Sequence, residues 1–392
     1  MSKILCLDMD AYFASVEIAS NPKLKNKPIG IVGSADRTVV TTASYEARKY
    51  GVKTGMPKFM AKKLCPHIEF IVGNFKKYSY ISSQIHDFLK TITYKVEMYS
   101  IDEAFIDISD VAVTPKDLGY LIKSHIKNNF GITCTVGVGK SKLVAKMATE
   151  INKPDGLNII NDEDVYAFLD TFSLNDIWGI GKKLTKKLNS LGIYSTKDIR
   201  KLNKDFFIKI FGKNGEKIYG MAFGEYPEGV KYESEPIKSI GHSITLPKDT
   251  FDRKLLDSYI LQLSDMVSFR ARKAHIAGKT INFHLRYSDM TKFSKMHTIG
   301  YPTSATHQIY EIAKYISKDI DLTKGVRHVG VSLGNLIYSC GSINDIFSKK
   351  WENVYSAIDS INQKHGNLTI TFANVLNCQR LSSNTLHPWQ KL

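Results

Sequence analysis

The stretch Ser100-Ile101-Asp102-Glu103 joins two apolar runs, Val96 to Ile101 and Ala104 to Ile108. Both runs are typical of strands. Asp102 and Glu103 therefore fall at the tight connection of a hairpin, whose turn can point both side chains the same way. In isolation, such a pair could simply solvate the turn.

A third acid, Asp8, stands near the end of the short apolar run from Lys3 to Met9, which indicates a buried strand. Three neighbouring carboxylates repel one another, so a site of this kind is stable mainly when cations occupy it. Mg²⁺ takes oxygen ligands and completes its shell with water and substrate phosphates. Two such ions, roughly 3.5–4 Å apart, can bind the attacking and leaving oxygens of a phosphoryl transfer.

The composition favours a cytosolic, multidomain protein that binds a polyanion. A chain of 392 residues is long enough for about two to four domains. Its formal charge of +16 indicates nucleic acid as the partner, with a membrane surface as the weaker alternative. No apolar run approaches the roughly 20 residues of a membrane span, and the N-terminus lacks a signal-like core. The five cysteines contain no Cys-x-x-Cys pair, which argues against a disulfide framework and a structural zinc site.

Ordered motifs surround the three acids. They run from Asp8 to Glu17 (Asp-Met-Asp-Ala-Tyr-Phe-Ala-Ser-Val-Glu), from Thr42 to Val52, from Ser100 to Phe105, from Thr135 to Lys142, from Lys153 to Gly156 and from Gly179 to Gly181. Together they resemble the Y-family translesion DNA polymerases, and the pattern is most similar to the DinB branch, that of bacterial DNA polymerase IV. The resemblance covers residues 1 to 340, and the tail beyond them matches less well.

The resemblance implies an active site with two Mg²⁺ ions. The implied ligands are Asp8, Asp102, Glu103 and the backbone carbonyl of Met9. Asp10 would not bind the metal itself but would support the residues that do. Phe13 would be the steric gate, an aromatic ring under the sugar of the incoming nucleotide, with which a ribose 2′-hydroxyl collides. Without the resemblance, Phe13 would be taken for an ordinary core aromatic.

A second implied group binds the triphosphate of the incoming deoxynucleotide. Tyr45 and Arg48 lie three residues apart in a helical stretch, so they project from one face, and Arg48 offers a planar donor fork for phosphate oxygens. The resemblance adds Thr42 and Lys153. The alternative for Arg48 and Lys153 is a solvated surface charge.

The expected fold is an α+β, multidomain, right-hand polymerase. It has a ferredoxin-like palm, small fingers, a helical thumb with a helix-hairpin-helix, and a β-α-β-β-α-β little finger. The predicted boundaries are 1–20 and 75–167 for the palm, 21–74 for the fingers, 168–230 for the thumb, 231–239 for a linker, 240–338 for the little finger and 339–392 for a C-terminal tail. In this family, short fingers imply an open site that tolerates damaged templates.

The thumb and the little finger are the predicted DNA-binding parts. Gly179 and Gly181 would let backbone N–H groups approach a phosphate closely, with Lys182 beside them. Residues 170–224 contain eleven Lys or Arg against five Asp or Glu, which favours this reading over a plain helix-connecting turn. In the little finger, Arg286 and Arg327 are the predicted phosphate contacts, although basic residues there could serve solubility alone.

The tail contains Ile343-Asn344-Asp345-Ile346-Phe347, where related polymerases often have a peptide that binds the sliding clamp. Position 343, where the clamp-binding peptide has a glutamine, is an isoleucine in this chain. Only Ile346 and Phe347 remain as candidate clamp contacts. The alternative is an amphipathic connector packed on the little finger. Beyond it, Trp351 to Ile361 predicts a helix, and Leu368 to Leu376 a strand.

The sequence therefore predicts a monomeric, low-fidelity, template-directed DNA polymerase that inserts deoxynucleotides opposite damaged bases of primer-template DNA. Two alternatives stay open. One is a palm-fold nucleotidyl cyclase, which would have no use for the basic C-terminal domain. The other is a catalytically silent DNA-binding adaptor, which would not need a full metal and triphosphate site.

Overall fold

The computed structural model describes residues 3–35, 37–233, 235–338, 346–366 and 369–378. Apart from short segments, one compact unit runs up to residue 234 and a second begins at Glu235. Within the described residues, no helix is both long enough and apolar enough to cross a membrane.

Strand β1 (Ile4–Met9) is the centre of the palm, a five-stranded sheet with the order β5-β6-β1-β7-β8. The other strands are β5 (Val96–Met98), β6 (Glu103–Asp107), β7 (Cys134–Gly139) and β8 (Leu157–Ile159). Its helices are α1 (Tyr12–Ser20), α4 (Phe75–Ile92), α5 (Pro115–Phe130) and α6 (Lys142–Thr149). The hairpin predicted around Asp102 and Glu103 is the antiparallel pair β5 and β6.

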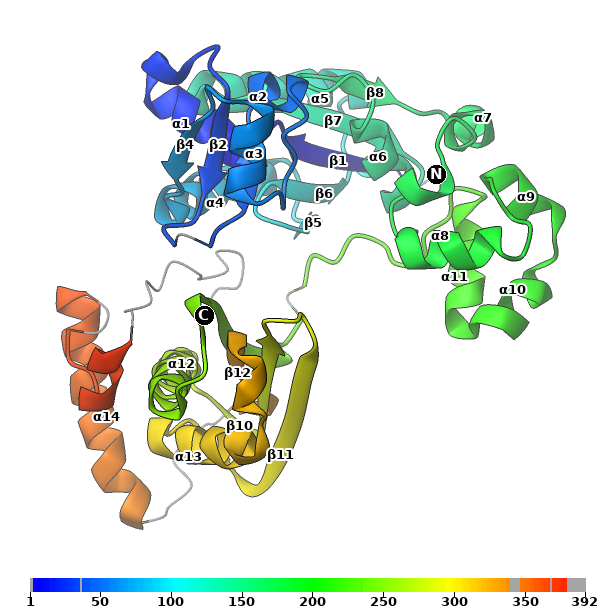
Figure 1. Cartoon of the computed structure of the whole chain (residues 1–392). Helices are drawn as coiled ribbons and strands as arrows, with labels where there is room; N and C mark the ends of the chain where they lie inside the picture. Colours follow the sequence, from blue (N-terminus) through cyan, green and yellow to red (C-terminus); the bar gives the residue numbers. More distant parts are fainter. Residues whose placement is uncertain (1–2, 36, 234, 339–345, 367–368, 379–392) are drawn as a thin grey trace. The chain divides into compact units, whose positions relative to one another are not determined.

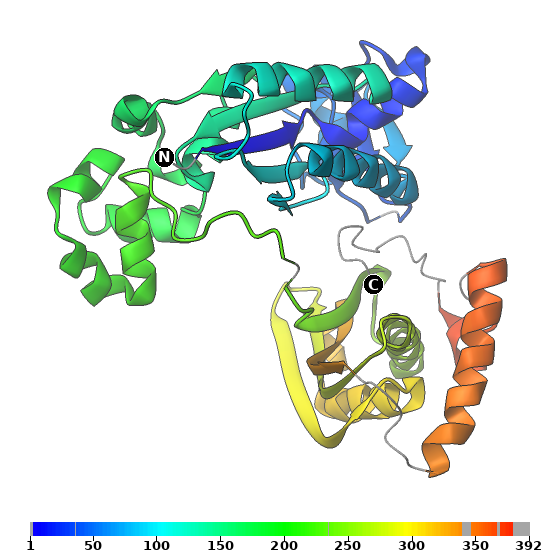
Figure 2. The same ribbon diagram turned by 180° about the vertical axis from the view of Figure 1, so that it is seen from behind.

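Helices cover both faces of the palm sheet (Figures 1 and 2). Leu5 and Leu7 pack in one core with α4 and α5, whereas Cys6 packs in another with Ala145 of α6. Because the side chains of a strand alternate between its faces, Asp8 lies on the α6 side. All six residues of β1 are buried as a result.

The fingers contain a small sheet with the order β3-β2-β4. Its elements are η1 (Pro22–Leu24), β2 (Ile29–Val32), β3 (Val40–Ala43), α2 (Tyr45–Lys49), α3 (Lys58–Leu64) and β4 (Glu69–Val72). The Ser44 hydroxyl accepts a hydrogen bond from the Ala47 amide at 3.3 Å, which caps α2. Of these elements, the sequence predicts a strand from Pro28 to Gly33, which is β2, and the helix with Tyr45 and Arg48, which is α2.

The thumb is helical throughout. Before it, η2 (Asp162–Asp164) lies within the range predicted for the palm, and α7 (Val165–Leu169) spans the predicted boundary. The elements within the predicted thumb are η3 (Leu174–Asp176), α8 (Lys182–Asn189), α9 (Thr196–Lys201), α10 (Lys204–Phe211) and α11 (Lys213–Met221). Side chains of α7, η3 and α8 to α11 share one core around Leu188, Ile199 and Phe207, to which α6 also contributes. A capping box of Ser195 and Asp198 begins α9.

The little finger has the predicted β-α-β-β-α-β order, and its sheet has the strand order β11-β10-β12-β9. The elements are β9 (Ser239–Thr250), α12 (Arg253–Lys273), β10 (Ile276–Tyr287), β11 (Lys292–Thr303), α13 (Thr306–Ile316), η4 (Ser317–Asp319), η5 (Leu322–Lys324) and β12 (Val326–Tyr338). Helices α12 and α13 share a core with one face of this sheet.

The tail forms α14 (Ile346–His365) and η6 (Ala373–Asn377). Arg272 of α12 forms an ion pair with Asp359 of α14 at 2.7 Å. The strand predicted for Leu368 to Leu376 is wrong, because Val375 and Cys378 enter the little-finger core at helical spacing. Ile343 and the side chains of Ile346 and Phe347 lie outside the described residues.

Candidate active site

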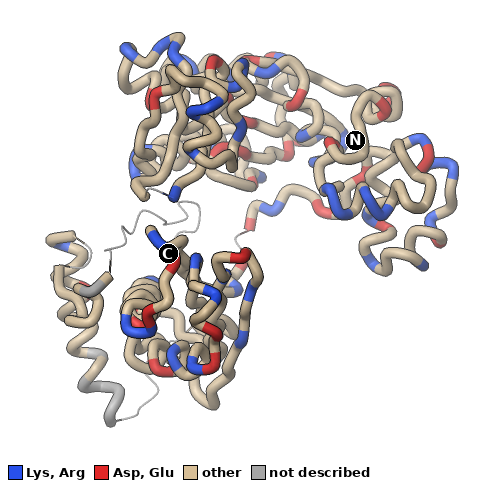
Figure 3. The backbone as a smooth tube through the Cα atoms, in the orientation of Figure 1, with Lys and Arg blue, Asp and Glu red and all other residues tan. Residues whose placement is uncertain are grey.

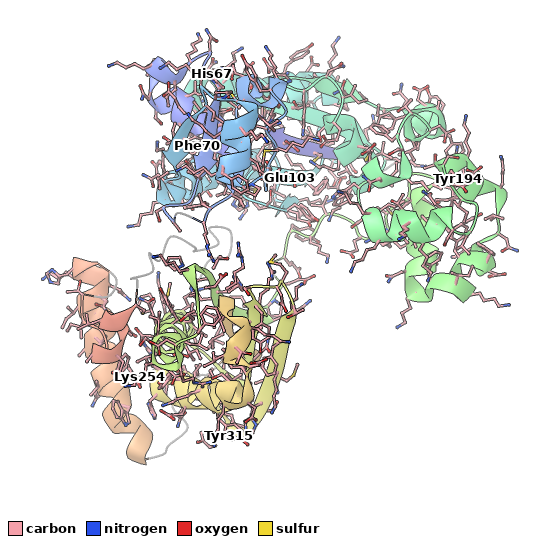
Figure 4. All side chains as sticks on the ribbon, in the orientation of Figure 1. His67, Phe70, Glu103, Tyr194, Lys254 and Tyr315 are labelled. Atoms are coloured by element: carbon pink, nitrogen blue, oxygen red, sulfur yellow. The ribbon has the colours of Figure 1, made fainter. Side chains whose placement is uncertain are left out.

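Asp8 and Glu103 are direct neighbours across the antiparallel strands β1 and β6. Both side chains are largely buried, 11% and 18% exposed. Asp102 precedes β6, and its backbone carbonyl accepts a hydrogen bond from the Met9 amide at 2.9 Å. The Ser100 hydroxyl donates to the Asp102 carboxylate at 2.5 Å. The register therefore brings the three predicted carboxylates to one end of the central strands; Glu103 is labelled in Figure 4.

An ammonium group that the sequence analysis did not predict lies between these acids. Lys146 of α6 forms ion pairs with Asp8 and Glu103, and a third with Glu150 at 3.3 Å. The predicted Lys153 contacts Asp8 at 3.0 Å and Glu150 at 3.1 Å. Like charges directly opposite in a sheet destabilise it, so the two ammonium groups stabilise this arrangement. The only sequence signal for Lys146 is its spacing of four residues from Glu150.

The ionisation of the cluster follows from burial and these ion pairs. Burial raises the pKa of Asp102, and also that of Glu103, where it outweighs the attraction of Lys146. Burial acts in the same direction on Asp8, but Lys146 and Lys153 outweigh it and hold the pKa of Asp8 below its ordinary value. Burial disfavours the charged form of Lys146, yet Asp8 and Glu103 raise its pKa overall.

The donor set fits a hard divalent cation, because it consists of carboxylate oxygens. Among the residues described, however, no three His, Cys, Asp or Glu side chains converge into a ready metal cluster. Lys146 pairs with Asp8 and Glu103, while Ser100 binds Asp102. A divalent cation would supply the positive charge that the lysines supply here.

Asp10 is 1% exposed and makes no ion pair with Lys146 or Lys153 among the contacts described. Its carboxylate accepts hydrogen bonds at 2.8 Å from the Thr135 hydroxyl and from the Asp155 amide, and one at 3.5 Å from the Tyr45 hydroxyl. These bonds connect β1 to the turn that contains Lys153 and to the fingers. Asp10 thus has a structural position behind the carboxylates.

The Phe13 ring is half-buried near the start of α1. It stacks on Tyr78, with centroids 4.5 Å apart and planes 13° apart, and meets Phe75 edge-on at 5.6 Å. The Tyr78 hydroxyl donates to Glu17 at 2.7 Å. Phe13 is therefore held in place by other rings and keeps an accessible side.

Three of the predicted triphosphate residues lie on β3 and α2. Thr42 is half-buried and pairs with Ile31 in the fingers sheet. The Arg48 guanidinium stands 4.8 Å from the centroid of the Tyr45 ring, so the two share one face as expected. The Arg48 Nε donates to the Ala43 carbonyl at 3.0 Å, which orients its fork. Lys153 belongs to a different segment, the turn after α6, and contacts Asp8.

The predicted thumb contact begins at α8. Gly179 has a φ of +97°, a conformation that favours glycine, and Gly181 is the N-cap of α8. An added Cβ at Gly181 would meet nothing within 4 Å. Lys182 is the first residue of the helix and is exposed, and Figure 3 shows further basic residues along α8.

The predicted little-finger contacts differ from each other. Arg286 lies in a cross-strand row with Lys292 and His328. It is on the face opposite the core side chains of β10, because it alternates with the buried Leu285. Arg327 stands at a bulge of β12 and is paired with Asp249 at 3.7 Å.

Fold and site together define a palm-type polymerase with an additional C-terminal β-α-β-β-α-β domain. Three family models match the chain: the impB/mucB/samB family over residues 7–150, its C-terminal domain over 237–343, and the IMS family HHH motif over 162–193.

Relatives and solved structures agree with this class. DNA polymerase IV of Desulfatibacillum aliphaticivorans is 34% identical over 377 residues, which cover 94% of this chain and 95% of that protein. DNA polymerase IV of Staphylococcus aureus strain JH9 is 35% identical over 339 residues, 85% and 95% of the two chains. The Y-family DNA polymerase chimera Dbh-Dpo4(243-245)-Dbh has a TM-score of 0.76 and DinB from Sulfolobus solfataricus one of 0.56; each is 30% identical and covers 86% of this chain and 100% of its own.

The chain belongs to the Y family of DNA polymerases, in its DinB branch. It is a DNA-directed DNA polymerase that uses primer-template DNA, deoxynucleoside triphosphates and a divalent metal. Membership of this family argues against both alternatives, the nucleotidyl cyclase and the catalytically silent adaptor.

Proposed function

We propose that this polymerase carries out translesion synthesis, inserting deoxynucleotides opposite damaged template bases with low fidelity. The small size of the fingers is the observation that supports this most. Their two α-helices, α2 and α3, contain five and seven residues. A helix of that length spans only about 8–11 Å, too little to close over a nascent base pair and test its shape.

In the same proposal, Asp8, Asp102, Glu103 and the Met9 carbonyl hold two Mg²⁺ ions. When bound, these ions supply positive charge to the attacking and leaving oxygens of the phosphoryl transfer. Arg48, Tyr45, Thr42 and Lys153 bind the triphosphate, and Phe13 excludes ribonucleotides. Replacing Arg48 by Ala should raise the apparent KM for nucleotide more than it weakens DNA binding.

The DNA is gripped without base specificity. The backbone amides at Gly179 and Gly181, with Lys182, bind a duplex phosphate at the start of α8, and Arg286 and Arg327 bind phosphates on the little finger. Arg327 would exchange its pairing with Asp249 for a phosphate, so we expect it to contribute less than Arg286.

Primer extension across a single abasic site tests the proposal. The purified protein, with Mg²⁺ and four deoxynucleotides, should insert nucleotides on both templates, one undamaged and one with the abasic site. Efficient copying of the undamaged template with a complete stop before the abasic site would contradict it.

Clamp binding by the tail is a separate proposal. Ile346 and Phe347 begin α14 and are the candidate contacts, and the polymerase itself acts as a monomer. A pull-down with purified sliding clamp should retain the wild type and lose Phe347→Ala. Equal retention would leave the segment as a connector on the little finger.

A further inference from the structure

Helix α3 of the fingers exposes apolar side chains to solvent. Phe59 is 74% exposed, and Met60 and Leu64 are 45% each, whereas Ala61 on the opposite side is buried in the fingers core. We name the outward surface of Phe59, Met60, Lys62 and Lys63 the α3 ridge. An aromatic ring this exposed contributes little to the core of its own domain, so its stacking face is available to a partner.

The surroundings of the α3 ridge are basic. The helix contains Lys58, Lys62 and Lys63 and no acid, and residues 21–74 contain ten Lys or Arg against three Asp or Glu. Figure 3 shows the basic residues of this part, and Figure 4 labels the nearby Phe70. Lys58 lies over the Phe70 ring at 5.3 Å, and Lys62 donates to the Ile68 carbonyl at 3.4 Å, so both are held at the surface by weak contacts.

The start of α3 contacts the segment that precedes β3, the strand that contains the predicted triphosphate residue Thr42. Val39, 44% exposed, forms a bridge with Pro57, and the Lys58 amide donates to the Thr38 carbonyl at 3.3 Å. Thr42, a predicted triphosphate residue, follows Val39 by three residues, which is at most about 10 Å along an extended backbone. The first turn of α3 therefore lies beside the strand that leads to the incoming nucleotide.

We propose that the α3 ridge binds the single-stranded template on the 5′ side of the templating base. Unpaired bases stack on aromatic side chains irrespective of sequence, and phosphates bind lysines; Phe59 offers the ring, with Lys62 and Lys63 beside it. This inference rests on the proposed function, because the position of the 5′ template is located relative to Thr42 and Arg48, the residues proposed to bind the nucleotide. The α3 ridge would steady a template whose next base is damaged and poorly stacked.

The test compares two primer-templates that differ only in their 5′ overhang, one nucleotide or eight. Fluorescence anisotropy should give the wild type about fivefold tighter binding to the longer overhang. Phe59→Ala should bind both substrates equally, and Phe59→Trp should keep the preference. Tyr80→Ala, which removes a ring 65% exposed on α4, is the matched control and should behave as the wild type.

Insertion of one nucleotide on the short-overhang substrate separates this inference from the proposed function. Phe59→Ala should insert at the wild-type rate there, because no base reaches the α3 ridge. An overhang preference that persists in Phe59→Ala, or is absent from the wild type, would overturn the inference while insertion continues. A partner protein on the α3 ridge, rather than template, would also give binding that is independent of the overhang.

Discussion

The palm sheet and the little-finger sheet use charge in opposite ways. Helices cover both faces of the palm sheet, so Asp8 and Glu103 are buried and act strongly on each other and on Lys146. The little finger shares its core with helices on one face, and its strands β10, β11 and β12 contain no acid. Burial on two faces suits a few strongly interacting groups, whereas an open face suits many weak, solvated contacts with a polyanion.

The largest expected effect lies in the palm. Glu103→Gln removes one charge without changing shape, so single-turnover primer extension should slow about a thousandfold. Asp107→Asn, at the other end of β6 and 25% exposed, is the control and should extend normally. Comparable extension rates for Glu103→Gln and Asp107→Asn would show that the carboxylate of Glu103, buried beside Asp8, has no part in the chemistry.

The next effect concerns sugar selection by a ring that the palm holds in place. Phe13→Ala should raise ribonucleotide incorporation about a hundredfold, by removing the clash with the 2′-hydroxyl, while deoxynucleotide incorporation changes little. Single-nucleotide insertion with matched ribo- and deoxynucleotides measures the ratio. An unchanged ratio would make Phe13 a core aromatic supported by Tyr78 and Phe75.

Lys146→Met tests whether the lysine stands in for metal charge. Without Mg²⁺ the variant should lose about 3–5 kcal/mol of stability, because Asp8 and Glu103 lose a buried partner. Added Mg²⁺ should then raise its Tm more than that of the wild type. Lys142→Met is the control: Lys142 lies one turn earlier on α6 and pairs with Glu97 at 2.7 Å, so its loss should destabilise the fold without a larger Mg²⁺ response. If Mg²⁺ raised the Tm of the wild type, Lys146→Met and Lys142→Met equally, Lys146 would not occupy the position of a metal charge.

The smallest effect belongs to the open face of the little finger. Arg286→Ala should weaken DNA binding uniformly across sequences and reduce the salt slope of log K by about one unit. Lys254→Ala changes an exposed charge on α12 and should leave the slope unchanged. The same salt slope of log K in both variants would indicate that Arg286 serves solubility and does not contact a phosphate.

The sequence predicts the placement of Asp8 on a buried strand and of Asp102 and Glu103 at a hairpin, since a buried strand and a hairpin are local patterns. Lys146 could not be predicted in the same way. It belongs to α6, whose residues are all buried, and only the packing of α6 across β1 places its ammonium beside the acids. The four-residue strands β3 and β4 were missed because so few residues show no clear period.

The tail shows the opposite error. The sequence predicts a strand for Leu368 to Leu376, but Ala373–Asn377 forms η6, and Val375 of η6 and the following Cys378 enter the little-finger core. Tertiary packing, which the local pattern does not contain, decided that conformation.

The most direct test of the account is single-turnover extension at saturating DNA with Asp102→Ala and Arg286→Ala side by side. We expect Asp102→Ala to bind primer-template normally and to give no extended product, and Arg286→Ala to extend at the wild-type rate once its DNA is saturated. Extension by Asp102→Ala at the wild-type rate, or a block in Arg286→Ala that saturation does not relieve, would contradict the division between a catalytic palm and a gripping little finger.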